Sequence, residues 1–136
     1  MRIPLALPKK HRLMKFVSDV FEFLDSPNSS VDVYLIDGRI MRKLNREFRG
    51  KNKATDILAF PYPEDFPIQK GKPRPLGDIY LNPEYIARNK ETLEYLLVHG
   101  LLHLLGFNHD KNSDRIKMEK LEKMVLKKTG RARHTD

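Results

Sequence analysis

The stretch "LEYLLVHGLLHLLGFNHD", residues 93–110, is the most apolar part of the chain and decides its fold. Leucine and valine stand on nearly every side of a helix drawn over residues 93–105, and a helix that is apolar all round is buried. Thr92 comes directly before this run and is a suitable N-cap. The sequence therefore predicts a central helix over 93–105 that the rest of the chain must cover.

Three histidines lie close together in this stretch. His99 and His103 are four residues apart, so both rings face one side of the predicted helix. Gly106 can adopt a positive φ at the helix end and turn the chain so that His109 returns toward the first two rings. Three imidazoles with an open fourth position are the ligand set of a catalytic zinc ion. The alternative is that His99 and His103 are core histidines with other hydrogen-bond partners and that His109 is an ordinary loop residue.

The same spacing occurs in the metzincin proteases, whose motif is H-E-x-x-H-x-x-G-x-x-H. In those enzymes the glutamate after the first histidine serves as the general base for peptide hydrolysis. Here Gly100 stands at that position. The histidines therefore predict a metal site. A metallopeptidase-like hydrolase is an alternative function, but it would lack the glutamate that acts as general base in metzincins.

The other elements follow from apolar spacing and from the positions of glycine and proline. We expect helices at 9–25, 39–48, 83–89 and 113–128, and strands at 31–37, 55–61 and 77–83. The last two strands flank a proline-rich loop at 61–75, which indicates a hairpin. The pattern predicts a single α+β (mixed α/β) domain over 1–136 with a small sheet, and a flexible basic tail after about residue 129.

Composition narrows the possible partners and metal ligands. The formal net charge is +8, which favours a polyanionic partner such as nucleic acid, although a solubilising surface charge is the alternative. The chain contains no cysteine, so disulfides, thiol nucleophiles and thiolate metal sites are excluded. No apolar stretch has the length of a signal-peptide core or a membrane span. We therefore expect a cytoplasmic protein with no membrane partner.

Three segments together resemble the YbeY-type endoribonucleases, a family of rRNA maturation factors. They are "HGLLHLLGFNHD" (99–110) followed by "ME" at 118–119, "RGKNKATDILAFP" (49–61) and "GDIYLNP" (77–83). The resemblance implies a small mixed four-stranded sheet packed with about five helices, and a metal site at the end of a buried helix. It implies one Zn²⁺ ion per chain, held by the three histidines. The implied role is 16S rRNA 3′-end processing and ribosome quality control in bacteria.

The resemblance also implies that Arg49, in a basic loop, is the functionally important arginine. Its guanidinium could stabilise the negative charge that develops on a phosphate during cleavage, whereas the alternative is a solvated loop residue. Lys51 and Lys53 could steer phosphates or could be plain surface charge. Asp110 could orient a ligand imidazole or could cap the next turn.

Three functions are compatible with these observations. The favoured one is a zinc-dependent endoribonuclease acting on single-stranded RNA, with rRNA and the small ribosomal subunit as partners. A three-histidine zinc ion lowers the pKa of bound water without help from a carboxylate base, which suits this reading. The alternatives are a metallopeptidase-like hydrolase and a non-catalytic ribosome assembly factor that contains zinc.

Overall fold

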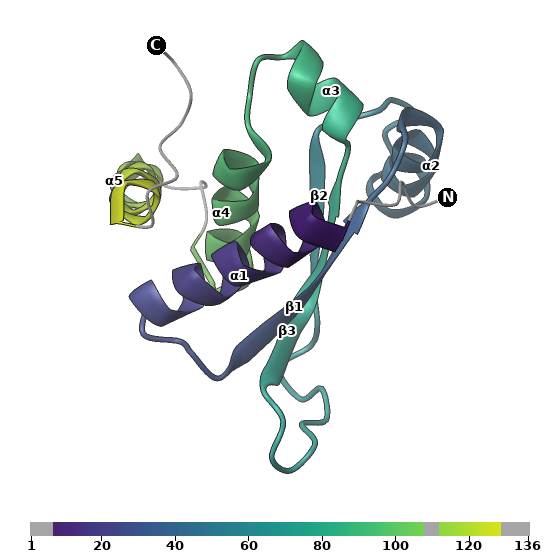
Figure 1. The fold of residues 1–136 in the computed structure, drawn as a ribbon. Helices are drawn as coiled ribbons and strands as arrows, with labels where there is room; N and C mark the ends of the chain where they lie inside the picture. Colours follow the sequence, from purple (N-terminus) through teal and green to yellow (C-terminus); the bar gives the residue numbers. More distant parts are fainter. Residues whose placement is uncertain (1–6, 108–111, 129–136) are drawn as a thin grey trace.

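The computed structural model describes residues 7–107 and 112–128. Its elements, in chain order, are α1 (Leu7–Phe23), β1 (Ser29–Leu35), α2 (Gly38–Arg49), β2 (Ile57–Pro61), β3 (Arg74–Leu81), α3 (Pro83–Arg88), α4 (Leu93–Leu104) and α5 (Asn112–Lys128) (Figure 1). Every helix and strand that apolar spacing predicts is present, with shifts of a few residues at the ends. The α+β fold class is therefore confirmed.

The described residues form one three-stranded sheet with the strand order β1-β3-β2. β1 runs parallel to β3, and β2 pairs with β3 in an antiparallel hairpin that sets Leu58 opposite Tyr80. The expected hairpin is thus confirmed, but the expectation of four strands is wrong by one strand within the described residues. The segment between β2 and β3 contains Pro63, Pro67 and Pro73, and because proline has no N–H to give to a ladder, this segment is a loop.

The sheet separates two apolar clusters. On one face Leu35, Ala59 and Ile79 pack with α1, α4 and α5, and this is the larger cluster. On the other face Leu58 packs with Met41 of α2. Figure 1 shows α2 set apart from the other long helices accordingly. The side chains alternate along each strand, so the two faces of the sheet hold different helices.

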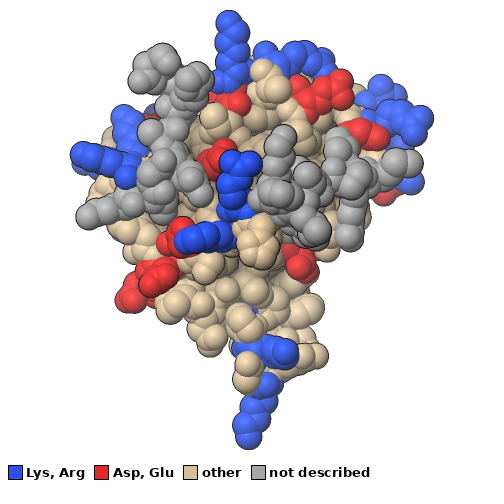
Figure 2. Space-filling model, viewed as in Figure 1, with Lys and Arg blue, Asp and Glu red and all other residues tan. Residues whose placement is uncertain are grey.

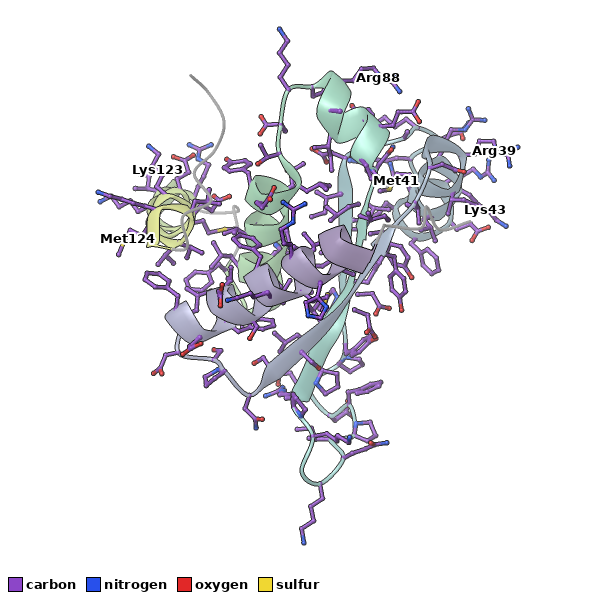
Figure 3. The ribbon with its side chains drawn as sticks, viewed as in Figure 1. Arg39, Met41, Lys43, Arg88, Lys123 and Met124 are labelled. Carbon is purple, nitrogen blue, oxygen red and sulfur yellow. The ribbon has the colours of Figure 1, made fainter. Side chains whose placement is uncertain are left out.

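The two sides of α2 meet different surroundings. Met41 is fully buried against the sheet, whereas Arg39 and Lys43 point away from it into solvent (Figure 3). The helix begins after Asp37, whose carboxylate accepts a hydrogen bond of 2.9 Å from the backbone N–H of Ile40. This capped helix covers the second face of the sheet with one apolar side and leaves a cationic side outward.

α4 is the buried helix that the leucine-rich stretch predicts. Thr92 caps it, and its Oγ1 accepts a hydrogen bond of 3.1 Å from the backbone N–H of Tyr95. Gly100 faces the sheet, and a Cβ at this position would lie 2.9 Å from Cδ1 of Ile57 and 3.1 Å from Cδ1 of Ile79. The glycine therefore allows α4 to approach the sheet closely. Neither α4 nor any other helix in the described part of the chain is long and apolar enough to cross a lipid bilayer.

The β2–β3 hairpin depends on Gly77. This residue pairs with Pro61 across the ladder. A Cβ at position 77 would collide with the carbonyl oxygen of Phe60 and would lie 2.9 Å from Cα of Pro61. These are backbone atoms of the partner strand, so they cannot move aside without breaking the pairing.

Candidate active site

His99 lies in α4, and its ring is held by a carboxylate from α5. The Nδ1 atom of His99 lies 3.1 Å from Oε2 of Glu122. The side chain of Glu122 is 3% exposed and that of His99 is 30% exposed. An ionised carboxylate accepts hydrogen bonds and donates none, so the tautomer that fits this contact carries its proton on Nδ1 and its lone pair on Nε2. Metal-binding histidines are commonly oriented in this way.

Glu122 is a candidate site residue that the sequence motifs miss. It shares the buried side of α5 with Met118, Val125 and Leu126, which follow the helical spacing of an apolar stripe. A carboxylate within such a stripe needs a partner in the core, and this pattern could have identified it. Asp110, for which we expected a similar role, lies outside the described residues.

His103 lies one turn further along α4, and its side chain is exposed. Beyond it, Gly106 has a φ of 105°, and the backbone N–H of Phe107 donates to the carbonyl oxygen of Leu102 at 3.1 Å. This is the Schellman arrangement of a helix end, so the expected positive φ at Gly106 is confirmed. His109, the expected third ligand, lies outside the described residues. Within those residues, no three His, Cys, Asp or Glu side chains form a group that could hold a metal.

Arg49 is the last residue of α2 rather than part of a loop, which corrects the expectation from sequence. Its Nη2 donates a hydrogen bond of 3.1 Å to the carbonyl oxygen of Ala59 in β2. The centre of its guanidinium lies 5.5 Å from the centre of the Phe60 ring. Because Ile57 of the same strand packs against α4, β2 contacts both Arg49 and the helix that carries the histidines.

Phe60 belongs to a row of aromatic contacts on the α2 side of the sheet. The ring centroids of Phe60 and Tyr80 lie 5.8 Å apart, and Tyr80 stacks on Tyr34 at 4.9 Å. Phe48 makes an edge contact of 5.4 Å with Phe60 and is 63% exposed. The exposed ring of Phe48 and the guanidinium of Arg49 both contact Phe60, so they offer one surface for a base and one group for a phosphate.

Tyr62, the residue that follows β2, forms a hydrogen bond with β3. Its hydroxyl donates a hydrogen bond of 2.7 Å to Oδ1 of Asp78, and its ring stacks on Phe66 at 4.5 Å. The hydrogen bond to Asp78 raises the pKa of the Tyr62 phenol well above its ordinary range, and burial and the carboxylate charge act in the same direction. These side chains pack on one another, so they contribute to the fold of the hairpin and its loop.

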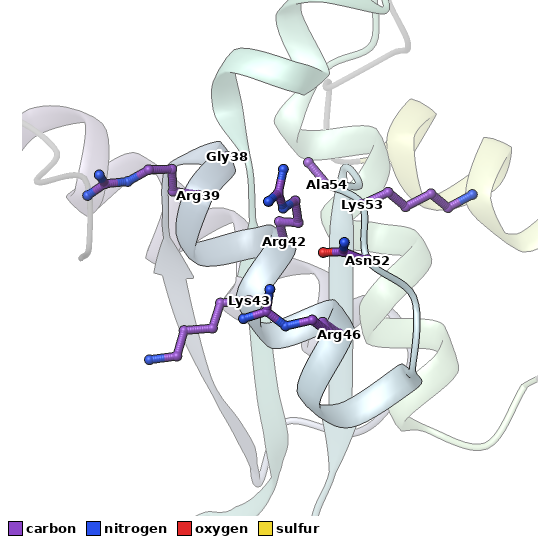
Figure 4. A pocket seen from close by; sticks show the side chains of 8 residues that line it. All are labelled: Gly38, Arg39, Arg42, Lys43, Arg46, Asn52, Lys53 and Ala54. Carbon is purple, nitrogen blue, oxygen red and sulfur yellow. The ribbon is translucent and has the colours of Figure 1, made fainter.

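The two lysines that follow α2 differ in their surroundings. Lys51 and Lys53 are both exposed. Lys53 lines an open depression beside α2, and Lys51 is not among its lining residues (Figure 4). The side chain of Asn45 is buried and its Nδ2 donates a hydrogen bond of 2.9 Å to the carbonyl oxygen of Lys53. This bond fixes the lysine segment against α2.

Positive charge is spread over the molecule rather than confined to the histidine helix. Figure 2 shows lysine and arginine side chains over α2 and α5, at opposite sides of the same view, with acidic side chains between them. Lys123 projects from α5 and Arg39 and Lys43 project from α2 (Figure 3). The surface of α2 is therefore one of several places where a polyanion could contact the protein.

Known proteins resemble this chain over most of its length. A family model described as Endoribonuclease YbeY matches residues 6–130. A Bartonella henselae protein of that name is 37% identical over 115 residues, which is 77% of this chain and 71% of the relative. The Buchnera aphidicola relative is 37% identical over 128 residues, 88% of this chain and 81% of its own. The Aquifex aeolicus relative is 32% identical over 133 residues, 91% of this chain and 86% of its own.

A solved structure supports the fold. The solution structure of a Thermotoga maritima protein superposes with a TM-score of 0.55 at 23% identity, and the match covers 92% of this chain and 87% of the other. Together with the family match, the fold and the histidine helix define a member of a known class of nucleases. The chain belongs to the YbeY family of endoribonucleases, so the resemblance found in the sequence is confirmed.

Proposed function

We propose that this protein is a zinc-dependent endoribonuclease that cuts single-stranded RNA. Its role is maturation of the 3′ end of 16S rRNA and ribosome quality control, with rRNA and the small ribosomal subunit as partners in the cytoplasm. The observation that supports this proposal is the His99–Glu122 pair. It orients an imidazole on the helix that also carries His103, in a chain that belongs to an endoribonuclease family.

The residues that would hold one Zn²⁺ ion are His99, His103 and His109. His99 fits a zinc ligand, because its ring is oriented by the buried carboxylate of Glu122. Metal-binding histidines are usually oriented in this way. The chain has no cysteine, so imidazole and carboxylate are the ligand types it can offer. When bound, zinc supplies a Lewis acid for a phosphoryl oxygen and lowers the pKa of water.

The chain's own residues have separate tasks in this proposal. Glu122 holds the proton at Nδ1 of His99 and fixes the orientation of the ring. Arg49 binds a phosphate of the substrate, because the planar guanidinium fork matches two phosphate oxygens. Its bond to Ala59 places the side chain at β2. As negative charge develops on the phosphate during cleavage, the guanidinium stabilises it.

The position of Gly100 argues against a metallopeptidase. In metzincins the general base follows the first histidine. Here a side chain at position 100 would be directed at Ile57 and Ile79 of the sheet rather than at solvent beside the histidines. A glutamate at this position would be buried in an apolar interface. The helix therefore cannot supply the base of a metzincin from this site.

The test is cleavage of an end-labelled RNA hairpin with a single-stranded 3′ extension. Wild type is compared with His103→Ala and Arg49→Ala, all purified identically. The matched control is Arg88→Ala, because Arg88 is also an exposed helical arginine and its partner is Glu84 on its own helix. We expect wild type and Arg88→Ala to cut the extension. Both site variants should lose activity by about a hundredfold or more, the scale of one lost charge-stabilising donor.

Zinc dependence is tested in the same assay with chelator. Cleavage by wild type should stop after chelation and return when Zn²⁺ is added. Equal cleavage by all variants would reveal a contaminating ribonuclease and remove the support for this proposal. An inactive wild type that still binds zinc stoichiometrically would favour the non-catalytic assembly factor, and cleavage of peptides would favour the metallopeptidase.

A further inference from the structure

An open depression of about 750 Å³ lies on the outer side of α2. It is lined by α2 and by the segment 52–54 that follows it (Figure 4). α2 packs on the face of the sheet opposite to α4. The depression, hereafter the α2 groove, is therefore separate from the histidine helix, and neither His99 nor His103 lines it.

The α2 groove is lined by cations, and the acidic side chain of Glu47, one turn beyond Lys43 on α2, is not among its lining residues. Five cationic side chains line it: Arg39, Arg42, Lys43, Arg46 and Lys53. No aspartate or glutamate lines it, and none of these five forms an ion pair with another residue in the described part of the chain. The four helical cations follow the spacing i, i+3, i+4 and i+7, which places them on one side of α2.

This arrangement is unfavourable for the helix by itself. Like charges four residues apart, such as Arg39 with Lys43 and Arg42 with Arg46, repel and destabilise an isolated helix. Figure 4 shows Arg42 between α2 and the segment 52–54, while Arg39 and Lys43 extend into solvent. A bound polyanion would remove the repulsion, because its charges would lie among the cations.

The wall of the groove is held in place by buried contacts. Asn45 is 3% exposed and donates to the carbonyl oxygen of Lys53 at 2.9 Å. The backbone N–H of Lys53 donates to the carbonyl oxygen of Lys51 at 3.0 Å. The segment that carries Asn52 and Lys53 is thus fixed before any ligand arrives, which lowers the entropic cost of binding.

We propose that the α2 groove binds the phosphate backbone of single-stranded RNA, on a part of the substrate outside the bond that is cut. The inference rests on the proposed endoribonuclease function. The row of cations leads along α2 to Arg49, one turn beyond Arg46, and spans about 15 Å from Arg39 at 1.5 Å per residue. A strand that follows this row reaches Arg49 and the exposed ring of Phe48.

Binding in the groove is independent of base sequence. Its charged side chains recognise phosphates, and phosphate contacts position a nucleic acid without reading its bases. Guanidinium groups suit this task because each can bind two phosphate oxygens at once. The groove therefore increases affinity for long substrates and leaves selection of the cleavage site to other contacts.

The experiment measures binding of a labelled oligouridine of about 20 nucleotides by fluorescence anisotropy over a series of salt concentrations, with full-length protein. Intact RNA is checked on a denaturing gel afterwards. The variant is Arg42→Gln/Arg46→Gln. Each lost phosphate contact on a single strand changes the slope of log K against log salt by about 0.7, so we expect a slope shallower by about 1.4. The dissociation constant at low salt should rise on the order of tenfold.

The control variant is Lys70→Gln/Lys72→Gln, which removes the same charge from an exposed loop outside the groove. It should bind with nearly the wild-type slope. An unchanged slope in the arginine variant overturns the proposal. An equal loss in the lysine variant also overturns it, because the effect would then reflect net charge alone. Circular dichroism confirms that both variants fold.

The two proposals can fail separately. If wild type does not cleave RNA but the arginine variant loses salt-dependent RNA binding, the groove is supported and the endoribonuclease function is not. If cleavage occurs and the slope is unchanged, the groove proposal fails alone. Polyglutamate of similar length is tested in parallel, and a loss of polyglutamate binding with RNA binding retained would assign the groove to an acidic protein and overturn the proposal.

Discussion

At the scale of single residues, the carboxylate of Glu122 is buried in the apolar side of α5 and contacts a histidine ring. A buried carboxylate is costly unless a partner compensates its charge. An imidazole whose other nitrogen binds a metal cation provides that compensation. The carboxylate accepts a hydrogen bond from the ring, and the positive charge of the ion lies on the other side of the same ring. The pair would thus be more favourable with the proposed zinc ion bound than without it.

Replacement of Glu122 by glutamine tests this coupling. Glu122→Gln keeps the size of the side chain but removes its charge, so metal affinity and RNA cleavage should both fall by about 10- to 100-fold. Competition with a chromogenic chelator measures the affinity. The control is Glu119→Gln, since Glu119 is exposed on the same helix. Equal affinities for the two variants would contradict the assigned role of Glu122.

The Tyr62–Asp78 hydrogen bond predicts a pH-dependent stability. The pKa of the phenol is raised in the folded state, while an unfolded tyrosine has a pKa of about 10. The stabilising contribution is fully present below pH 10, and it is lost as the pH rises from there through the folded pKa. Tyr62→Phe should therefore cost about 1 kcal/mol of unfolding free energy at pH 8, and less at pH 11.

Urea denaturation at the two pH values measures this difference. Tyr85→Phe is the control for loss of a tyrosine hydroxyl, because the hydroxyl of Tyr85 makes no hydrogen bond to the described residues. A Tyr62→Phe difference of the same size at both pH values would contradict the pKa argument.

At the scale of secondary structure, the hairpin is the element most sensitive to a single methyl group. Gly77→Ala would force a Cβ into the backbone of Phe60 and Pro61. We expect the unfolding free energy to fall by about 3 kcal/mol, which is the upper end of the usual cost of adding a group to a packed site. Gly38→Ala is the matched control, since a Cβ there comes no closer than 4.0 Å to Nδ2 of Asn82. Thermal or urea unfolding should leave this control as stable as wild type or more stable.

The elements that the sequence predicts best are those with a strong local pattern. The leucine-rich run and Thr92 define α4 because apolar periodicity and an N-cap are encoded by neighbouring residues. The β2–β3 hairpin follows from two apolar runs separated by prolines. The fourth strand came from the resemblance alone, and no comparable apolar run supports it in the described residues.

Other features depend on tertiary packing and are not predictable in this way. The contact between His99 and Glu122 joins residues 23 positions apart on two helices, and it depends on how α5 packs against α4. The apolar spacing ends at Phe48 and therefore predicts a loop at Arg49. The helix instead continues until Gly50, whose φ of 69° ends it. Helix ends are therefore better judged from the capping glycine than from the last apolar residue.

At the scale of the whole molecule, the proposed zinc ion would stabilise the fold. It binds the native state only, so a ligand at a hundred times its dissociation constant adds about 2.7 kcal/mol of stability. Removal with chelator should lower the melting temperature of wild type by roughly 5–10 °C. His103→Ala should show no such shift. A wild type that melts at one temperature with and without chelator would contradict zinc binding.

β3 is the middle strand of the sheet but the last strand in chain order. During translation, β1 and β2 therefore have no sheet partner until β3 has left the ribosome exit tunnel. The histidine site comes later still, because it joins α4 to α5, the last two helices of the described chain. A nascent chain thus has no complete histidine site until α5 has been made. On the proposed function, an unfinished copy cannot cut the ribosome that is making it.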